Sequence, residues 1–212
     1  MHSHNEEAVL NGIDPDIFNE TVGYLSDAGM PGVSDPGNAL VCYCQAHHLS
    51  YEVLPGANAA LLAYVTSGMP QHQFLFYGFL SHKGAERQNE LFEVLNTSFV
   101  VILYEAPHRI EKLIEELVTH APTRTLFAIK EATKLHEKRF LGTPIEIQEA
   151  FKNANLKGEW VVVIAPEITQ GGEAITKEDL LGLDLPPKQK AKLLSKLTGL
   201  SVKEWYNTLQ NE

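Results

Sequence analysis

The sequence predicts a two-domain α/β protein with a short helical tail. Short apolar segments alternate with loop-and-helix patterns in residues 22–67, and longer apolar segments begin after Gly68-Met69-Pro70. Beyond Gly171-Gly172 the pattern is that of two or three short helices. We therefore expect two α/β domains and the tail, with these bounds: 1–70, 71–168 and 173–212.

The overall composition is typical of a globular protein. The chain has 212 residues, of which 44% are hydrophobic and 21% are charged, and this length is enough for a sizeable core. No apolar run approaches the roughly 20 residues that a membrane-spanning helix needs, and the N-terminus shows no signal-peptide pattern. We expect a cytoplasmic protein.

The two cysteines raise the question of a metal site, because they stand in the pattern Cys42-x-Cys44-x-x-His47-His48. Residues two apart on the helix expected there point to different sides, so the two thiols would diverge. We therefore expect no metal site.

The charge is unevenly distributed. The net charge is −10, which argues against non-specific attraction to nucleic acid. Residues 186–212 nevertheless carry five lysines and two glutamates, a net charge of +3, which leaves −13 for the first 185 residues. A basic tail on an acidic body suits contact with a polyanion, and a solvated helical face explains it about as well.

The first distinctive segment is SDAGMPGVSDPG, at residues 26–37. Three glycines and two prolines within twelve residues exclude the interior of a strand or helix. The apolar run 22–25 before it predicts a strand, and a helix follows to about His48. We expect a loop at the carboxyl end of that strand, where ligands bind in open α/β sheets; a tight turn is the alternative.

The next segments repeat this order of elements. Tyr51-Glu52-Val53-Leu54 predicts a strand, Pro55-Gly56-Ala57-Asn58 a sharp loop, and residues 59–67 a helix that is apolar nearly all round. Two strand–loop–helix units in succession predict a parallel sheet.

The second half begins with a further apolar segment and contains four predicted strands, at residues 74–79, 99–104, 126–129 and 160–165. Helices follow the first two strands, one through Leu91 and Leu95 and one ending at His120. In the tail, Ser201-Val202-Lys203-Glu204 has the form of a helix capping box.

Charged residues stand directly after these strands, as in Glu105-Ala106-Pro107-His108-Arg109 and Lys130-Glu131-Ala132-Thr133-Lys134. If the strands are parallel, these side chains converge on one cleft. Taken singly, each of these charged residues could instead be a helix cap or part of a surface ion pair. The motifs of dinucleotide-binding, phosphate-loop, zinc-protease and serine-hydrolase sites are absent, which disfavours those chemistries.

Six segments, in order and spacing, carry a resemblance to a known family: SDAGMPGVSDPG (26–37), LPGANA (54–59), FYGFLSHKGAER (76–87), YEAPHR (104–109), KEATK (130–134) and KGEWVVVI (157–164). The chain resembles the bacterial ribosomal RNA small subunit methyltransferase I family, which methylates a cytidine 2′-hydroxyl in the decoding region of 16S rRNA. The resemblance covers residues 2–166. It implies a two-domain tetrapyrrole-methylase-like fold, S-adenosylmethionine as cofactor, the small ribosomal subunit as partner and a homodimer.

The resemblance also implies site residues. The cofactor pocket would be formed by Ser26, Asp27, Ala28, Gly29, Pro31, Asn58, Ala59, Tyr104, Glu105, Glu131, Ala132, Thr133, Gly158 and Glu159. The 2′-hydroxyl is a poor nucleophile, so we expect Glu105 or Asp35 to take its proton, with Arg109 or Lys134 holding an adjacent phosphate. Substrate contacts are expected from Lys83, Arg87, His108, Arg109 and Lys134.

One departure from the family concerns the start of the chain. The family opens with a strand and a Pro-Ile-Gly-Asn-Leu-like loop, whereas the first matching residues here are His2-Ser3-His4-Asn5-Glu6, which belong after both. We therefore expect this sequence to lack the family's first strands. Two alternative functions stay open: a tetrapyrrole methyltransferase, in which the basic tail would have no purpose, and a non-catalytic dimeric fragment that binds RNA or the ribosome.

Overall fold

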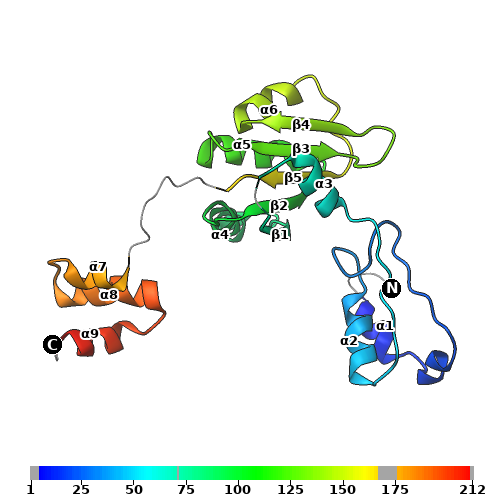
Figure 1. The fold of residues 1–212 in the computed structure, drawn as a ribbon, viewed down its shortest axis with the longest axis horizontal. Helices are drawn as coiled ribbons and strands as arrows, with labels where there is room; N and C mark the ends of the chain where they lie inside the picture. The colour runs from blue at the N-terminus through cyan, green and yellow to red at the C-terminus, as the bar shows by residue number, and fades with distance from the viewer. Residues whose placement is uncertain (1–4, 71, 167–175, 211–212) are drawn as a thin grey trace. The chain divides into compact units, whose positions relative to one another are not determined.

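The structure is a computed structural model that describes residues 5–70, 72–166 and 176–210 (Figure 1). The chain divides into two compact units, Met1–Glu167 and Ile168–Glu212. Each unit is described by itself below. The expected division of the first unit near residue 70 stays a prediction.

The first unit contains one five-stranded mixed sheet with the spatial order β1-β2-β5-β3-β4. β1 pairs with β2 in parallel, and the other three pairs are antiparallel. Because β2 and β3 both run antiparallel to β5, they run in the same direction as each other. The strands are β1 (Phe74–Phe79), β2 (Val100–Glu105), β3 (Leu126–Lys130), β4 (Lys138–Gly142) and β5 (Trp160–Ile164).

The four strands predicted in the second half are therefore confirmed, whereas β4 was not predicted. The sequence of β4 is Lys-Arg-Phe-Leu-Gly, which contains no apolar run, and its residues are exposed or half-buried. An edge strand of this kind is held by its backbone pairing with β3, and that pairing leaves little trace in a hydrophobic pattern.

Alternate residues of the strands face two separate apolar clusters, as the period of two in a strand requires. Val101 and Leu103 of β2 belong to the cluster under three helices, α4 (Gly84–Leu95), α5 (Ile110–His120) and α6 (Pro144–Phe151). Val100 and Ile102 face the other cluster, which α3 (Ala59–Ser67) covers. Helices thus cover both faces of the sheet (Figure 1).

The first part of the unit has less regular structure, with α1 (Glu6–Asn11), the 3₁₀ helix η1 (Pro15–Asn19) and α2 (Asn38–Ala46). The strands predicted at 22–25 and 51–54 are wrong: neither segment is paired in a sheet. Leu25 is 88% exposed and Leu54 is 69% exposed. A strand is stabilised by backbone pairing and burial, and within the described ranges these two segments have neither. The helices predicted after each of them are confirmed as α2 and α3.

The second unit is a small bundle of α7 (Lys177–Gly182), α8 (Pro187–Thr198) and α9 (Val202–Gln210), which confirms the predicted tail helices. Its own core is formed by Leu180, Ala191, Leu194 and Trp205. The capping box at the start of α9 is also confirmed, because the Glu204 carboxylate accepts hydrogen bonds from the backbone and hydroxyl of Ser201 at 2.8 and 2.7 Å.

Across the described ranges, no helix has both the length and the apolar character needed to cross a membrane. The same ranges contain no cluster of three or more His, Cys, Asp or Glu side chains suited to a metal ion. Cys42 is exposed and Cys44 is buried, so the two thiols diverge on α2.

The sheet core should dominate the stability of the first unit. Leu103 is completely buried in β2, so Leu103→Ala should lower the free energy of unfolding by about 2–5 kcal/mol. Leu141→Ala in β4 is a matched control, because Leu141 is 66% exposed, and it should cost less than about 1 kcal/mol. Urea unfolding of both variants tests this. Equal losses would mean that the assigned core is wrong.

Candidate active site

The polar residues predicted to converge do so at one edge of the sheet. Glu105 ends β2 and Lys130 ends β3, and both stand opposite Trp160, the first residue of β5. The residues that precede β5, Gly158 and Glu159, therefore lie at the same edge. This convergence arises in a mixed sheet, where two strand ends meet the start of a third, and not in the all-parallel sheet assumed from the sequence.

The first group of residues at this edge joins the loop after β3 to the segment before β5. The Glu131 amide donates to the Glu159 carbonyl at 2.9 Å, and the Glu159 amide donates to Glu131 Oε1 at 2.9 Å. Lys134 Nζ lies 3.1 Å from Glu131 Oε1 and 2.8 Å from Glu159 Oε2. We call Glu131, Lys134, Gly158 and Glu159 the 131–159 junction.

The junction is conformationally demanding. Glu131 has φ +51° and Thr133 has φ +67°, values that are uncommon outside glycine and least favourable for a β-branched residue. Gly158 has φ +124°, and a Cβ atom added there would lie 2.5 Å from Glu131 Cγ. Residues held in such conformations cluster at functional sites, because the surrounding structure must hold them in place.

Hydrogen bonding also affects the acidity of the junction. The backbone amide of Glu159, and then the ammonium group of Lys134, lower the pKa of Glu131. Because the pKa of Glu131 is lower in the folded state, its ionised carboxylate stabilises the fold at pH values above the pKa that Glu131 has in the unfolded chain. The junction therefore loses this contribution as the pH falls through the lowered pKa.

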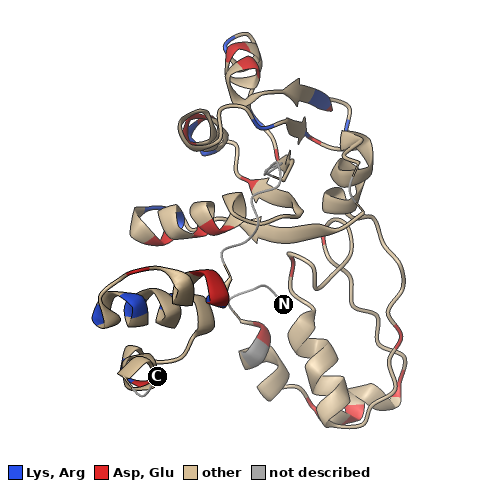
Figure 2. Ribbon diagram, turned by 60° about the vertical axis from the view of Figure 1, so that its left-hand side comes forward, with Lys and Arg blue, Asp and Glu red and all other residues tan. Residues whose placement is uncertain are grey.

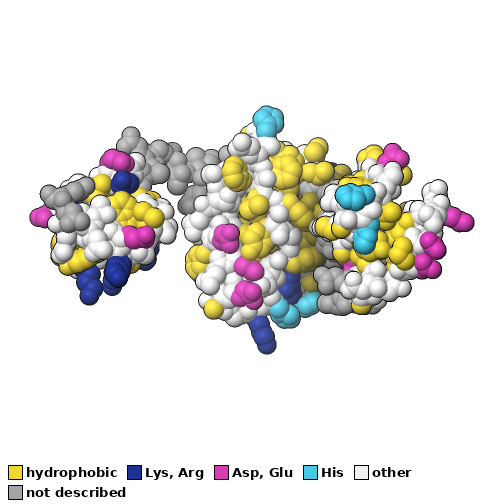
Figure 3. Space-filling view, turned by 90° about the horizontal axis from the view of Figure 1, so that it is seen from below, with side chains coloured by type: hydrophobic (Ala, Val, Ile, Leu, Met, Phe, Trp, Pro, Cys, Tyr) yellow, Lys and Arg dark blue, Asp and Glu magenta, His cyan; other side chains and the backbone are white. Residues whose placement is uncertain are grey.

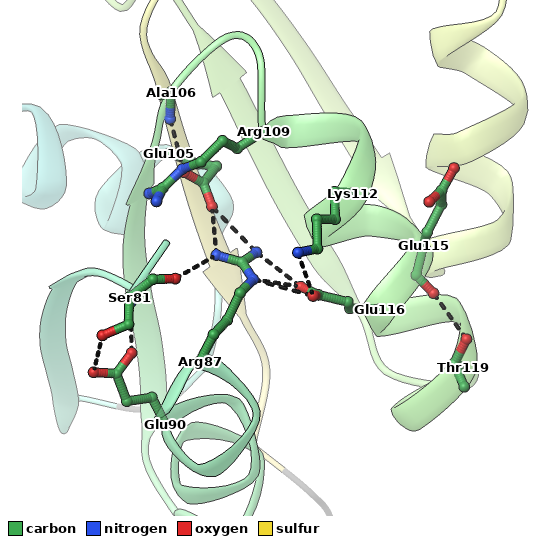
Figure 4. A network of polar contacts seen from close by, with 10 residues as sticks. All are labelled: Ser81, Arg87, Glu90, Glu105, Ala106, Arg109, Lys112, Glu115, Glu116 and Thr119. Carbon is green, nitrogen blue, oxygen red and sulfur yellow. Dashed lines mark hydrogen bonds and ion pairs between the residues drawn. The ribbon is translucent and has the colours of Figure 1, made fainter. Parts of the chain in front are cut away.

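A second group surrounds Glu105, whose side chain is completely buried (Figure 4). Its Oε1 accepts hydrogen bonds from Arg109 Nε at 2.6 Å and from the Ala106 amide at 2.9 Å. Its Oε2 lies 3.4 Å from both terminal nitrogens of Arg87. Every oxygen of this buried carboxylate thus has a donor, which burial of a charge requires.

Arg87 links this carboxylate to a second one. Its Nε and NH2 donate to Glu116 of α5 at 2.7–3.0 Å, and its NH1 donates to the Ser81 carbonyl at 3.2 Å. Burial acts to lower the pKa of Arg87, and the hydrogen bonds and charges of Glu116 and Glu105 outweigh it and raise that pKa. We call Arg87, Glu105, Arg109 and Glu116 the buried charge network.

This network bears on two roles predicted from the sequence. Proton transfer by Glu105 and substrate binding by Arg87 both require contact with a ligand, yet the two side chains are enclosed and occupied by each other. Arg109 is 12% exposed and also bound to Glu105. Lys83 and His108 are exposed at the same edge of the sheet.

Sequence reasoning missed three members of this region: Ser81, Glu90 and Glu116. The Ser81 amide and hydroxyl donate to Glu90 at 2.6 and 2.7 Å, which fixes the loop after β1 to α4. Glu116 lies 29 residues from Arg87 and occupies an ordinary charged position on an amphipathic helix. No local pattern distinguishes such a residue from a solvated one.

A third group of predicted site residues lies around Tyr104, near the start of α3. Tyr104, Ala59 and Ala132 all pack at the margin of the apolar cluster under α3. Burial raises the pKa of the Tyr104 hydroxyl, and a hydrogen bond with the Ala60 backbone opposes that shift without cancelling it. Asn58 caps this helix, with Oδ1 accepting from the Leu61 amide at 2.9 Å.

The first glycine-rich loop contacts the second one. The Met30 amide donates to the Ala57 carbonyl at 2.9 Å, and Ser26 Oγ donates to the Gly29 carbonyl at 2.9 Å. Gly29 has φ +77°, and a Cβ atom there would lie 3.0 Å from the Ala57 carbonyl oxygen. The predicted cofactor residues Asp27 and Ala28 are exposed, as is Asp35, and Pro31 is half-buried.

The fold and this arrangement of loops define a class of protein. Residues 4–148 match the family model described as tetrapyrrole (corrin/porphyrin) methylases, so the chain is a member of that class. The match covers more than half of the chain.

Comparison with individual proteins gives the family within the class. The chain is 44% identical over 210 residues to ribosomal RNA small subunit methyltransferase I of Campylobacter fetus, covering 99% of this chain and 78% of the relative. It is 41% identical over 212 residues to the protein of that name from Helicobacter pylori strain J99, covering 97% and 73%. The chain belongs to the ribosomal RNA small subunit methyltransferase I family.

Solved structures show weaker similarity. The methyltransferase CobJ is 22% identical, with a TM-score of 0.47, and the match covers 68% of this chain and 64% of that one. Uroporphyrin-III C-methyltransferase from Thermus thermophilus, complexed with S-adenosyl homocysteine, is 19% identical with a TM-score of 0.44, over 67% and 64% of the two chains.

The 131–159 junction makes Gly158 a sensitive position. We expect Gly158→Ala to lower the free energy of unfolding by about 1–3 kcal/mol, because it combines an unfavourable φ with a clash against Glu131. Gly84→Ala is the control, since Gly84 has φ +80° with nothing within 4 Å of an added Cβ, and it should cost less.

The Glu131→Ala background separates the clash from the backbone strain. There Gly158→Ala should cost measurably less than in the parent, because the side chain it strikes is gone. Denaturant unfolding of all four combinations gives the coupling. Strict additivity would contradict the packing described for Gly158.

Proposed function

We propose that this chain transfers a methyl group from S-adenosylmethionine to the 2′-hydroxyl of a cytidine ribose in the decoding region of small-subunit ribosomal RNA. The observation that carries this proposal is family membership over nearly the whole chain, at 44% identity across 210 residues. The edge of the sheet described above supports it, because it gathers exposed polar residues from segments distant in sequence.

The residues present fit this cofactor. The backbone amides of Asp27, Ala28 and Ala132 make no hydrogen bond within the described part of the chain, so they are available to its carboxylate and hydroxyl groups. Tyr104 and Ala132 add half-buried apolar surface, and Gly29 keeps the backbone free of a side chain. When bound, the cofactor supplies an electrophilic methyl group on a sulfonium centre.

The protein's part in the reaction is to align the hydroxyl and to ease the loss of its proton. Of the two carboxylates considered for that proton, Asp35 is exposed and Glu105 is enclosed, so we propose Asp35 for this role. Lys83 and His108 are exposed near the end of β2, where they suit contact with RNA phosphate or ribose. Arg109 is paired with Glu105, so only the exposed part of its side chain could contact an RNA phosphate.

We assign Glu105 and Arg87 to positioning and not to direct contact with substrate. Their ion pair, completed by Glu116, joins the end of β2 to α4 and α5. Arg87 donates to the Ser81 carbonyl in the loop that follows β1, and Glu105 stands where the loop after β2 begins. The network therefore sets where Lys83 and His108 stand. An enclosed ion pair serves this purpose because both of its charges are already neutralised.

We also propose that the chain acts as a homodimer in the cytoplasm, as the resemblance implies. Support for the dimer comes from exposed apolar side chains on α3 and on the edge strand β1. Leu61 is 47% exposed, Val65 75% and Phe79 51%. Figure 3 shows hydrophobic side chains gathered over this unit. A second copy of the chain is a suitable partner for such a surface.

The test of the proposed function combines binding and activity. We expect the purified chain to bind S-adenosylmethionine in calorimetry and to methylate purified small ribosomal subunits. Gly29→Ala should weaken cofactor binding at least about tenfold, or 1.4 kcal/mol, because its Cβ would press on the Ala57 carbonyl and displace both loops.

Gly23→Ala is the matched control, since an added Cβ there meets nothing within 4 Å. It should leave cofactor affinity unchanged. If Gly29→Ala bound the cofactor as tightly as the control, the two loops would not form the pocket. If the parent chain transferred no methyl group to small subunits, the proposed function itself would be refuted.

A further inference from the structure

The second unit separates its charges between helices. α8, with the sequence PKQKAKLLSKLT, contains four lysines and no acidic residue, whereas α7 begins with Lys177-Glu178-Asp179. Figure 2 shows the basic residues of this unit concentrated on one helix. The first 185 residues of the chain are strongly acidic, so this helix is the most basic stretch of the protein.

Three of the four lysines form a stripe. Lys188, Lys192 and Lys196 are each four residues apart, so they lie along one face of α8, and all three are exposed. The buried positions Ala191 and Leu194 point to a different face. We call Lys188, Lys192 and Lys196 the α8 lysine stripe. Figure 3 shows basic side chains projecting from this unit into solvent.

The stripe does not hold the described part of the unit together. The fourth lysine, Lys190, donates to the Leu181 carbonyl at 2.8 Å and so ties α8 to α7. Lys188, Lys192 and Lys196 make neither an ion pair nor a hydrogen bond with any other described residue. Like charges four apart destabilise a helix by a few tenths of a kcal/mol, so the arrangement costs stability and gains nothing within the fold.

The surroundings of the stripe favour phosphate over an apolar partner. The neighbouring positions on the same side of α8 are Gln189 and Ser195, which are polar and able to donate hydrogen bonds. The core that holds the helix is complete without a ligand, because Leu180, Leu194 and Trp205 bury one another. The stripe is thus presented by a preformed scaffold, which lowers the entropic cost of binding.

We propose that the α8 lysine stripe docks on the phosphate backbone of the ribosomal RNA substrate and supplies electrostatic affinity that the acidic body lacks. This inference rests on the proposed function for the identity of the RNA. The contact is to phosphates and not to bases, because the deep, narrow major groove of an RNA helix does not admit a protein helix. Such a contact holds the enzyme on its substrate without reading sequence.

The test uses the full chain with Lys188, Lys192 and Lys196 all changed to Gln, which removes charge and keeps helix propensity. The probe is a fluorescently labelled transcript of small-subunit ribosomal RNA, with anisotropy measured across a range of salt. We expect affinity to fall at least about tenfold near 0.1 M salt, and the slope of log affinity against log salt to shrink by about two to three.

Lys138→Gln, Lys152→Gln and Lys157→Gln, combined in one chain, form the control. These three lysines are exposed on the first unit and give the same change in net charge. The control should keep most of the affinity and of the salt slope. Equal affinities and equal salt slopes for the two triple variants would overturn the proposal.

Cofactor affinity and the kinetics of methyl transfer distinguish failure of this proposal from failure of the proposed function. In the α8 variant, cofactor affinity should be unchanged, and methyl transfer should show a raised KM for small subunits with kcat retained. An unchanged KM would contradict the docking role. RNA binding is measured without the cofactor, so its outcome holds even if methyl transfer is not found.

Discussion

The buried carboxylate of Glu105 is the constraint around which the edge of the sheet is organised. A charge in that position is tolerated only when each oxygen has a donor, and here Arg109, the Ala106 amide and Arg87 provide them. Arg87 reaches this carboxylate from α4, and its own charge is also paired with Glu116 of α5. One carboxylate thereby fixes two helices against strand β2.

The direction of the strands gives this constraint its functional consequence. β2 and β3 end where β5 begins, so the buried charge network and the 131–159 junction share one edge of the sheet. The charged groups of the network are paired with one another, whereas the loop after β3 holds Glu131 and Thr133 in left-handed conformations at the surface. Rigid support beneath a strained, exposed loop is the arrangement that a preorganised binding site requires.

The sequence predicted the parts of this fold that burial determines. The runs at 99–104 and 160–165 are apolar throughout because both of their faces are covered, and such runs are recognisable without a structure. The segments 22–25 and 51–54 are shorter and carry fewer apolar residues, and strand formation there depends on a pairing partner that hydrophobicity does not reveal. The motif residues Glu105 and Arg87 were identified as important, but their pairing with each other and with Glu116 is a tertiary contact that no local pattern encodes.

A double-mutant cycle on this network tests the account most directly. Arg87→Met should lower the free energy of unfolding by about 3–5 kcal/mol while Glu105 keeps its charge, because the change leaves a buried carboxylate short of a partner. In the Glu105→Gln background the same substitution should cost markedly less, a coupling of at least about 1 kcal/mol. Equal costs in the two backgrounds would show that the ion pair does not organise this edge, and would contradict the account.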